Sequence, residues 1–473
     1  MSGGRTPRLA VIGAGVSGLT AAFRLRQGLG DDAVIDVYDA ASEPGGLLHT
    51  RTVGGVAVDA GAEAFIVRRP EARDLVAELG LAERVVSPGG LRPAIFARGA
   101  LHTLPSPAVM GIPADPSVTA GLADPDDLAR MTAEPDTALA WTAGADPSVG
   151  DLVADRFGPS VVARSVDPML GGVYSALAGQ LGLRETIPAL ARALDDGAPS
   201  LTAAVRTVLD AGSAASGPVF GALRGGYREL VDALVAAGRA HLRLGVEVIG
   251  VEALGGESAG GGPGFAVRTA TGGGRDDAVE YDGVVVAVPI WTAGRLLAAL
   301  APEPAAVFAD VAPAGSAIVA VAVPEAAALP AHSGVLVATD EDAVRLKAIT
   351  LSSQKWPHLR GGPVATLRTS FGRLGDRVDA TDDELVRLAL ADLETVFGAA
   401  GLAAPDIVDA VVQRWPTGLP HYAPGHLARV GAAAGDLPRG IAVAGAGYAG
   451  VGVPACIGTA TAAVGKVTAD LRT

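Results

Sequence analysis

The sequence predicts an α/β fold, and its N-terminal segment carries most of that prediction. An apolar run at residues 8–12 breaks into a glycine-rich turn at 13–18, and an alanine-rich helical pattern follows over 19–25. A second apolar strand, 33–39, ends in an acid. The spacing Gly-x-Gly-x-x-Gly between a strand and a helix is typical of a Rossmann-like dinucleotide-binding unit, in which phosphates lie at the helix N-terminus.

Each glycine of this turn has a separate expected role. Gly13 allows the tight turn, Gly15 lets the backbone approach a pyrophosphate, and Gly18 allows the helix to pack closely on the strand. Asp39 is placed to bind a ribose hydroxyl, although many proteins with this motif carry the longer glutamate there. Because glycine is abundant (64 residues), an ordinary glycine-rich turn is the alternative, and the flanking strands, helix and acid argue against it.

Composition and charge narrow the class of protein further. The chain of 473 residues is 49% apolar, which is typical of two or three globular domains, and its net charge of −14 argues against nucleic acid as a partner. The single cysteine, Cys456, excludes a disulfide within the chain, and the seven histidines lack zinc spacing, so no metal is expected. The N-terminus lacks signal-peptide features, which favours a cytoplasmic protein. The longest uncharged run, 441–465, is interrupted by glycines and Pro454, so no transmembrane span is expected, whereas peripheral membrane contact stays open.

Pattern and composition divide the chain into three parts, two of them discontinuous. These are a nucleotide-binding part (1–70, 210–289 and 415–473), an α+β substrate-binding part (71–105 and 290–414) and a helical insertion (106–209). In the first part, the segments 242–251, 264–269 and 279–288 are expected to form three strands of a meander. Residues 94–97 and 100–104 are expected to form a hairpin, and a second strand, glycine turn and helix over 440–467 returns the chain to the first unit.

Several further motifs resemble those of the FAD-dependent coproporphyrinogen and protoporphyrinogen oxidases, within the amine oxidase-like flavoproteins. The resemblance covers nearly the whole chain. It rests on the Gly45-Gly46-Leu47 segment, the loop 59–65, the hairpin end Leu104-Pro105, the helix Pro168–Tyr174 and the C-terminal segment 448–457. It implies a Rossmann-like FAD-binding domain of the two-dinucleotide flavoprotein type, with an α+β substrate domain and a helical insertion.

The resemblance also implies an activity. FAD would take hydride from a meso carbon of a porphyrinogen, and molecular oxygen would reoxidise it to give hydrogen peroxide, in haem biosynthesis. The Arg-rich, Lys-poor composition suggests a high-GC Gram-positive bacterium and therefore coproporphyrinogen III as substrate. Protoporphyrinogen IX is the alternative, and a flavin amine oxidase or a non-catalytic flavoprotein scaffold is more distant. No side chain is expected to act as a catalytic acid or base. A transient contact with a ferrochelatase, which would accept the product, is a possible interaction that the sequence does not decide.

The motifs assign site residues by the same resemblance. The FAD contacts implied are Gly13, Ala14, Gly15, Val16, Ser17, Gly18, Asp39, Ala40, Gly46, Leu47, Gly61, Ala62, Glu63, Ala64, Val248, Trp415, Val451, Gly452 and Val453. The substrate contacts implied are Arg92, Gly171, Gly172, Leu367 and Phe371, with Arg92 facing a propionate. Core packing is the alternative for Trp415, Gly171, Gly172, Leu367 and Phe371, and an ordinary strand valine is the alternative for Val248.

Overall fold

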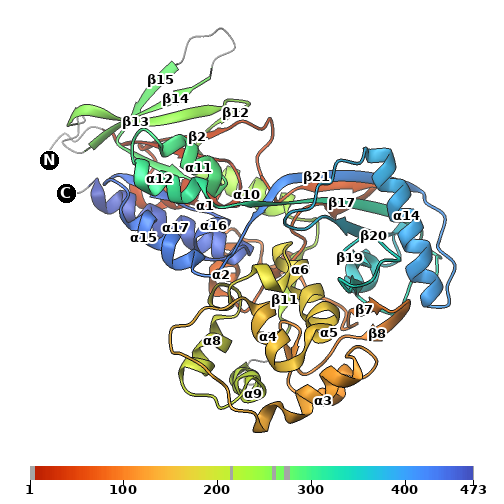
Figure 1. Cartoon of the computed structure of the whole chain (residues 1–473). Helices are drawn as coiled ribbons and strands as arrows, with labels where there is room; N and C mark the ends of the chain where they lie inside the picture. The colour runs from red at the N-terminus through yellow and green to blue at the C-terminus, as the bar shows by residue number, and fades with distance from the viewer. Residues whose placement is uncertain (1–5, 213–216, 258–262, 271–276, 472–473) are drawn as a thin grey trace.

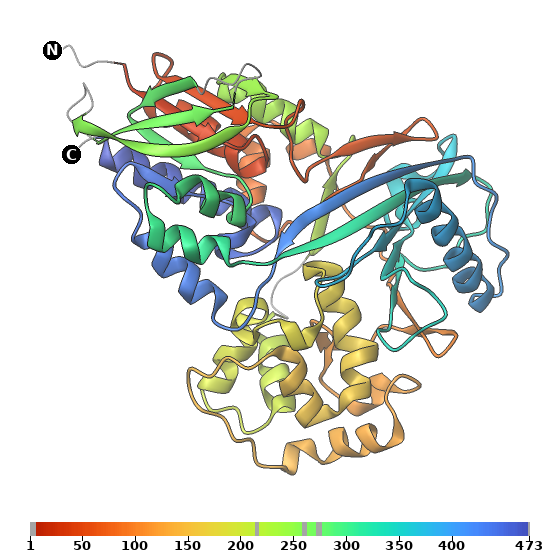
Figure 2. The ribbon, with the colours of Figure 1, turned by 45° about the horizontal axis from the view of Figure 1, so that its top comes forward.

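Three parts meet around the centre of the molecule (Figure 1). The computed structural model describes residues 6–212, 217–257, 263–270 and 277–471. One part is a parallel sheet with its covering helices, the second is a mixed sheet, and the third is helical. Figure 2 shows two long strands that run from beside the parallel sheet into the mixed sheet. These strands connect the two parts of the molecule directly.

The parallel sheet has the strand order β12-β2-β1-β16-β22. Its strands are β1 (Arg8–Ile12), β2 (Val34–Asp39), β12 (His241–Leu244), β16 (Gly283–Val286) and β22 (Ile441–Val443). The pairings are all parallel. The three central strands are almost wholly buried, which explains why they are apolar runs rather than alternating patterns.

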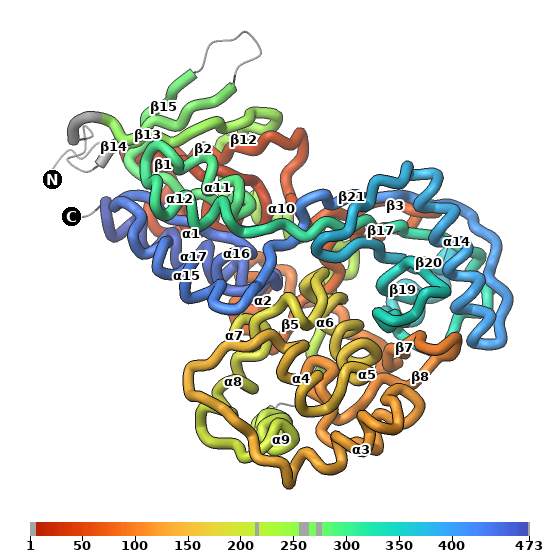
Figure 3. The backbone as a smooth tube through the Cα atoms, in the orientation of Figure 1, coloured from red at the N-terminus to blue at the C-terminus, as the bar shows by residue number. Residues whose placement is uncertain are grey.

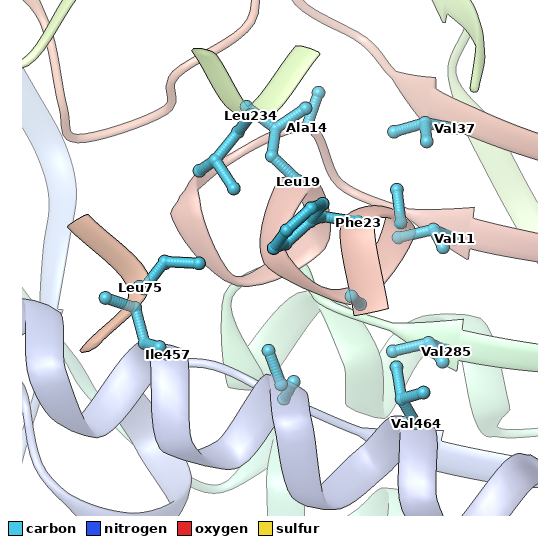
Figure 4. Close-up of a cluster of buried hydrophobic side chains, with 14 of the residues drawn as sticks. Val11, Ala14, Leu19, Phe23, Val37, Leu75, Leu234, Val285, Ile457 and Val464 are labelled. Atoms are coloured by element: carbon cyan, nitrogen blue, oxygen red, sulfur yellow. The ribbon is translucent and has the colours of Figure 1, made fainter. Parts of the chain in front are cut away.

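Helices from distant parts of the chain cover one face of this sheet. They are α1 (Val16–Leu29), α2 (Pro70–Glu78), α10 (Arg228–Gly238) and α17 (Val453–Asp470). Figure 4 shows Leu19 and Phe23 of α1 among Val11, Val285 and Ile457, all in one buried cluster. Burying each such side chain contributes about 1.5–3 kcal/mol, so the two ends of the chain are held together mainly by apolar contact.

The other face carries the meander and three further helices. The meander strands are β13 (Val248–Glu257), β14 (Pro263–Thr269) and β15 (Asp277–Tyr281), and the helices α11 (Ile290–Leu297), α12 (Pro302–Ala309) and α15 (His426–Gly435) pack in the same cluster. The helices α11 and α12 therefore lie with the nucleotide-binding part, beyond the boundary expected at residue 289. The rest of the three-part division stays a prediction.

The expected strands 242–251 and 279–288 were each wrong as single elements. Gly245, with a φ of +69°, turns the chain between β12, which joins the parallel sheet, and β13, which joins the meander. Asp282 marks the second break, because its backbone N–H donates to Arg8 O at 2.8 Å and ties the start of β16 to β1. The periodicity was strand-like on both sides of each break, so it could not reveal a change of sheet.

The mixed sheet has the strand order β21-β17-β20-β19-β18-β7-β8. Its strands are β21 (Asp409–Pro420), β17 (Pro313–Pro324), β20 (Val364–Phe371), β19 (Ala348–Thr350), β18 (Gly334–Val337), β7 (Ala94–Ala97) and β8 (Ala100–Thr103). The expected hairpin is confirmed, with Arg98 and Gly99 at positive φ in a two-residue turn between β7 and β8. Helix α14 (Asp382–Ala399) packs on one face through a buried cluster.

The helical part has its own core. Its longer helices are α3 (Pro125–Ala133), α4 (Val149–Phe157), α6 (Asp167–Tyr174), α8 (Pro188–Asp195) and α9 (Leu201–Gly212). The remaining elements are short: β3 (Thr50–Val53), β4 (Val56–Asp59), β5 (Phe65–Ile66), β6 (Val85–Val86), β9 (Ala108–Val109), β10 (Ile112–Pro113), β11 (Phe220–Leu223), α5 (Pro159–Val161), α7 (Leu183–Thr186), α13 (Ser352–Lys355) and α16 (Ala446–Ala449). The tube in Figure 3 shows α6 reaching from this part toward the other two.

Candidate functional site

A cavity of about 950 Å³ lies where the three parts meet. One end is formed at the carboxyl ends of the parallel strands, by residues that follow β1, β2, β16 and β22. The other end is formed by the mixed sheet, by α6 and by the loop that contains Gly61. Ligands of open α/β sheets bind at the carboxyl ends of the strands, so the location alone marks this cavity as the candidate site.

The nucleotide end of the cavity is built mainly from backbone. Among the residues that the structure describes, no side chain caps the N-terminus of α1 at Gly15 or that of α17 at Gly452, so both helices present free N–H groups there. A Cβ on Gly15 would come no closer than 4.0 Å to another residue, at Gly46 Cα, so the space in front of Gly15 belongs to the cavity. In contrast, a Cβ on Gly18 would lie 1.7 Å from Gly13 O, which is the close helix–strand packing expected of the third glycine.

Asp39 lines this end and also fixes the glycine-rich turn. Its carboxylate accepts hydrogen bonds from Ala14 N at 2.7 Å and Ala41 N at 2.8 Å. Each oxygen keeps a second lone pair, so a ribose hydroxyl could still bind there. The bond to Ala14 shows a second role for this acid, in holding the turn against the end of β2.

The sheet end is built from side chains instead. Glu63 Oε2 accepts from Lys355 Nζ at 2.5 Å, and Glu63 Oε1 lies 3.8 Å from Arg368 Nη1. Burial raises the pKa of Glu63, but the charges of Lys355 and Arg368 overcome this effect and lower it to about 2. The three charges sum to +1 at neutral pH, so this end attracts anions.

Hydrogen bonds make the loop beside this cluster rigid. Arg368 Nη2 donates to Gly61 O at 2.8 Å, and Trp415 Nε1 donates to Ala60 O at 2.9 Å. A Cβ on Gly61 would lie 1.9 Å from Leu47 O, so only glycine fits between the two segments. Gly61 and Trp415 are therefore fixed relative to each other in the cavity wall.

Lys347 is a further cation in the wall, at the side of α6. Its Nζ donates to Ser175 Oγ and to Gly372 O, both at 2.7 Å. Within the described ranges, no carboxylate lies at ion-pair distance from it, and its residue is only 5% exposed. Burial is the main cause that lowers the pKa of Lys347 to about 7, and the nearby positive charge of Arg373 contributes to the same shift.

Most of the expected site residues line this one cavity. They are Gly13, Gly15, Val16, Ser17, Asp39, Ala40, Gly46, Leu47, Gly61, Ala62, Glu63, Ala64, Gly172, Val248, Trp415, Val451, Gly452 and Val453. Ala14 and Gly18 lie behind the wall, where one donates to Asp39 and the other packs on Gly13. Their individual contacts with a ligand stay predictions.

The remaining substrate residues do not line the cavity. Leu367 and Phe371 lie in the core beneath α14, so packing, the alternative given for them, is what the structure shows. Gly171 lies beside Arg373 without lining the cavity, and Arg92 is exposed. The alternation of β20 explains this placement, because Arg368 and Ser370 line the cavity whereas Leu367 and Phe371 face the core.

Sequence reasoning missed the cations of the sheet end. Lys347, Lys355 and Arg368 all line the cavity, as does Arg295 at its nucleotide end. Two of the chain's three lysines are therefore in one site. In a chain with three lysines, each lysine was a usable candidate for a site residue. The sequence does not give the register of the mixed sheet, however, and that register is needed to place a lysine in the cavity wall.

The fold and the cavity define a class of protein in which a parallel α/β part forms a nucleotide-type site and a mixed sheet forms the other end of the same cavity. The chain belongs to the flavin-containing amine oxidoreductase family, whose match covers residues 16–468. It therefore binds a flavin, and the predicted fold class is confirmed.

Sequence relatives and solved structures with the same fold show which proteins the chain is similar to. The chain is 48% identical over 466 residues to the coproporphyrinogen III oxidase of Mycobacterium tuberculosis H37Rv, covering 98% of each chain, and 27% identical to that of Bacillus subtilis, also over 98% of each. The structure of a proposed protoporphyrinogen oxidase from an Exiguobacterium species matches with a TM-score of 0.84 at 24% identity, covering all of both chains. Cyclohexylamine oxidase from Brevibacterium oxydans matches with a TM-score of 0.69 at 18% identity, over 99% of this chain and all of that one.

Two features are absent from the residues that the structure describes. No helix there is both long and apolar enough to cross a membrane. No group of three or more histidine, cysteine, aspartate or glutamate side chains there is arranged to hold a metal ion.

Proposed function

We propose that this protein is an FAD-dependent coproporphyrinogen III oxidase of haem biosynthesis, with molecular oxygen as the acceptor and hydrogen peroxide as by-product. The observation that carries the proposal is the 48% identity, over 98% of both chains, to relatives named for that activity. The positive sheet end of the cavity supports it, since coproporphyrinogen III carries four propionates.

The residues present fit FAD. The open N-termini of α1 and α17 and the free space before Gly15 suit a pyrophosphate, and Asp39 suits the adenosine ribose. Val248 lines the cavity beyond Asp39, as an adenine contact requires. The bound flavin would accept hydride from a meso carbon of the substrate, and it supplies the redox chemistry that no side chain can.

The protein's own residues would bind and orient the macrocycle. Lys355 and Arg368 bring positive charge to carboxylates at the sheet end, and Glu63 stays ionised at neutral pH because its pKa is about 2. The bonds from Arg368 and Trp415 to the 60–61 backbone keep the wall in place as the substrate enters. Holding the meso carbon in one position is the main contribution that such a preorganised wall makes to the rate.

Amine oxidation, the more distant alternative, fits the cavity less well. Among the described residues, the aromatic side chains that line it are Tyr38, Trp291 and Trp415, and the first two lie at the nucleotide end. An aromatic cage around an amine is therefore missing at the sheet end. The cations at that end would also repel an ammonium substrate.

The location and a downstream partner are parts of the proposal. We place the reaction in the cytoplasm, a compartment in which a chain with one buried cysteine and no disulfide is ordinary. A transient contact with a ferrochelatase would pass on the porphyrin product.

Oxidation of the two porphyrinogens by the purified flavoprotein tests the function. We expect a higher kcat/KM for freshly reduced coproporphyrinogen III than for protoporphyrinogen IX, followed in air by porphyrin fluorescence, because two extra propionates meet the positive wall. The reverse preference would make protoporphyrinogen IX the substrate. Turnover of neither by flavin-loaded protein would leave the fold and overturn the proposed function.

A further inference from the structure

We propose that Lys347 is a substrate-positioning residue, whose ammonium group binds one carboxylate of the substrate, with Arg373 supplying a second positive charge beside it. This inference rests on the proposed function for the identity of the carboxylate. It places an anion subsite between α6 and the start of β19, apart from the Glu63–Lys355–Arg368 cluster.

The hydrogen bonds of Lys347 leave one position open. An ammonium group has three N–H donors, and Ser175 Oγ and Gly372 O take two of them at 2.7 Å. Ser175 also lines the cavity, so the nitrogen lies at the cavity wall. The third donor is therefore available to a ligand without any rearrangement of the first two bonds.

Arg373 adds a donor group that is also unsatisfied. Its Nε is buried and has no hydrogen-bond partner among the described residues. The same atom lies 3.6 Å from where a Cβ on Gly171 would stand, so the glycine in α6 leaves room for the guanidinium. A buried ammonium group next to a partly buried guanidinium group, each with an open donor, is costly in isolation, and a bound carboxylate would remove that cost.

Two carboxylates balance the charge of this pair while Lys347 is protonated, and both are held by other groups. Asp376 and Asp167 are the carboxylates that act on Arg373, and Asp376 also acts on Lys347. The Asp167 carboxylate is occupied by Ala178 N at 2.7 Å and Thr339 Oγ1 at 2.9 Å, and an Asp376 oxygen accepts from Arg373 N at 2.9 Å. Neither forms an ion pair with Lys347, whereas Lys355 has Glu63 at 2.5 Å.

The burial of Lys347 gives the subsite a pH dependence with a definite sign. Because its pKa is about 7 without ligand, the ammonium form is present below pH 7 and is lost above it. Binding of a carboxylate should therefore weaken as the pH rises through 7. A lysine that served as a proton acceptor would behave in the opposite way, since only its neutral form could accept a proton.

The test is the binding of coproporphyrin III, the stable oxidised tetracarboxylate, to flavin-loaded protein, followed by porphyrin fluorescence. We expect Lys347→Met to raise Kd and the KM of the porphyrinogen by about ten- to a hundredfold at pH 6, with kcat within about a factor of two. Wild-type Kd should rise by tenfold or more from about pH 6 to 9, and the Lys347→Met values should be nearly flat. Lys347→Arg should keep the affinity at both pH values, because guanidinium stays charged.

The third lysine of the chain gives a matched control. Lys466 of α17 donates to Ala434 O at 3.2 Å and does not line the cavity, so Lys466→Met should leave Kd and its pH profile unchanged. An unchanged Kd in Lys347→Met would overturn the inference. It would also be overturned if Lys347→Met lost most of its kcat while kcat/KM of the wild type rose through pH 7, because that pattern indicates a proton acceptor. If the wild type turns over the porphyrinogen and Lys347→Met changes neither Kd nor KM, only the proposed subsite is refuted. If the wild type neither binds nor turns over the porphyrinogen, the proposed function is refuted as well.

Discussion

The two ends of the cavity differ in the groups that line them: one is lined mainly by backbone and the other mainly by charged side chains. The nucleotide end is built mainly from glycines, helix N-termini and an acid whose partners are backbone N–H groups. The sheet end is built mainly from charged side chains far apart in the sequence: Glu63 from a loop, Lys355 from α13 and Arg368 from β20. The comparison teaches that backbone recognition is fixed by local spacing along the chain, whereas side-chain recognition is fixed by the register of a sheet.

The largest expected effect breaks the nucleotide end alone. Gly15→Val should lower flavin affinity by about a hundredfold, because its side chain would occupy the space of the pyrophosphate, while the backbone φ of −74° accepts valine. Flavin absorbance after gel filtration, with far-UV circular dichroism for the fold, measures the result. A yellow, fully active Gly15→Val protein would remove the phosphate from this position.

Gly28 gives the control for that substitution on the same helix. It is exposed, and a Cβ there would meet nothing within 4 Å. Gly28→Ala should keep its flavin and gain about 0.5–1 kcal/mol in the free energy of unfolding, since alanine is the better helix former.

The second effect breaks the charge balance of the sheet end. Glu63→Gln should lower the free energy of unfolding by about 2 kcal/mol at pH 7, because Lys355 and Arg368 lose their counter-ion. The pKa of Glu63 is lowered from 4.5 to about 2, so its stabilisation is complete above pH 4.5 and is lost as the pH falls toward 2. Urea unfolding at several pH values should show the difference from wild type shrinking over that window. A difference that did not depend on pH, or one matched by Glu394→Gln on the exposed side of α14, would contradict the ion cluster.

The smallest effect sharpens the contrast between the two cavity lysines. Lys347→Met should raise the free energy of unfolding of the ligand-free protein by about 1 kcal/mol at pH 6, since a buried cation without a carboxylate is replaced by an apolar chain. Its pKa is lowered from 10.5 to about 7, so the gain should be full below pH 7 and vanish as the pH approaches 10.5. Thermal unfolding at both ends of that range checks the sign. Lys355→Met, which removes the partner of Glu63, should be destabilising, and equal signs for the two would refute the contrast.

The same comparison explains what could be predicted from the sequence. The turn 13–18, Asp39, the 61–64 loop and the 451–453 segment all line the cavity or support its wall, because each motif is continuous in the chain. On β20 the prediction chose Leu367 and Phe371, and the cavity residues are Arg368 and Ser370. A shift of one residue exchanges the two faces of a strand, and a single sequence does not fix that register. The splits at Gly245 and Asp282 were missed for the same reason, since strand pattern does not name the partner strand.

The order of strands in the parallel sheet has a consequence for synthesis of the protein. Strand β1 is the central strand of five, yet its neighbour β16 and the edge strand β22 are made much later, and α17 packs on α1 only after the last segment has been translated. The emerging chain therefore carries an unfinished sheet with an open edge for most of its synthesis, and it lacks one of the two helix N-termini that face the cavity. Cofactor capture must follow translation rather than accompany it. Until β16 has been made, one edge of β1 has no partner strand, so this edge is the part of the emerging chain that most needs protection from aggregation.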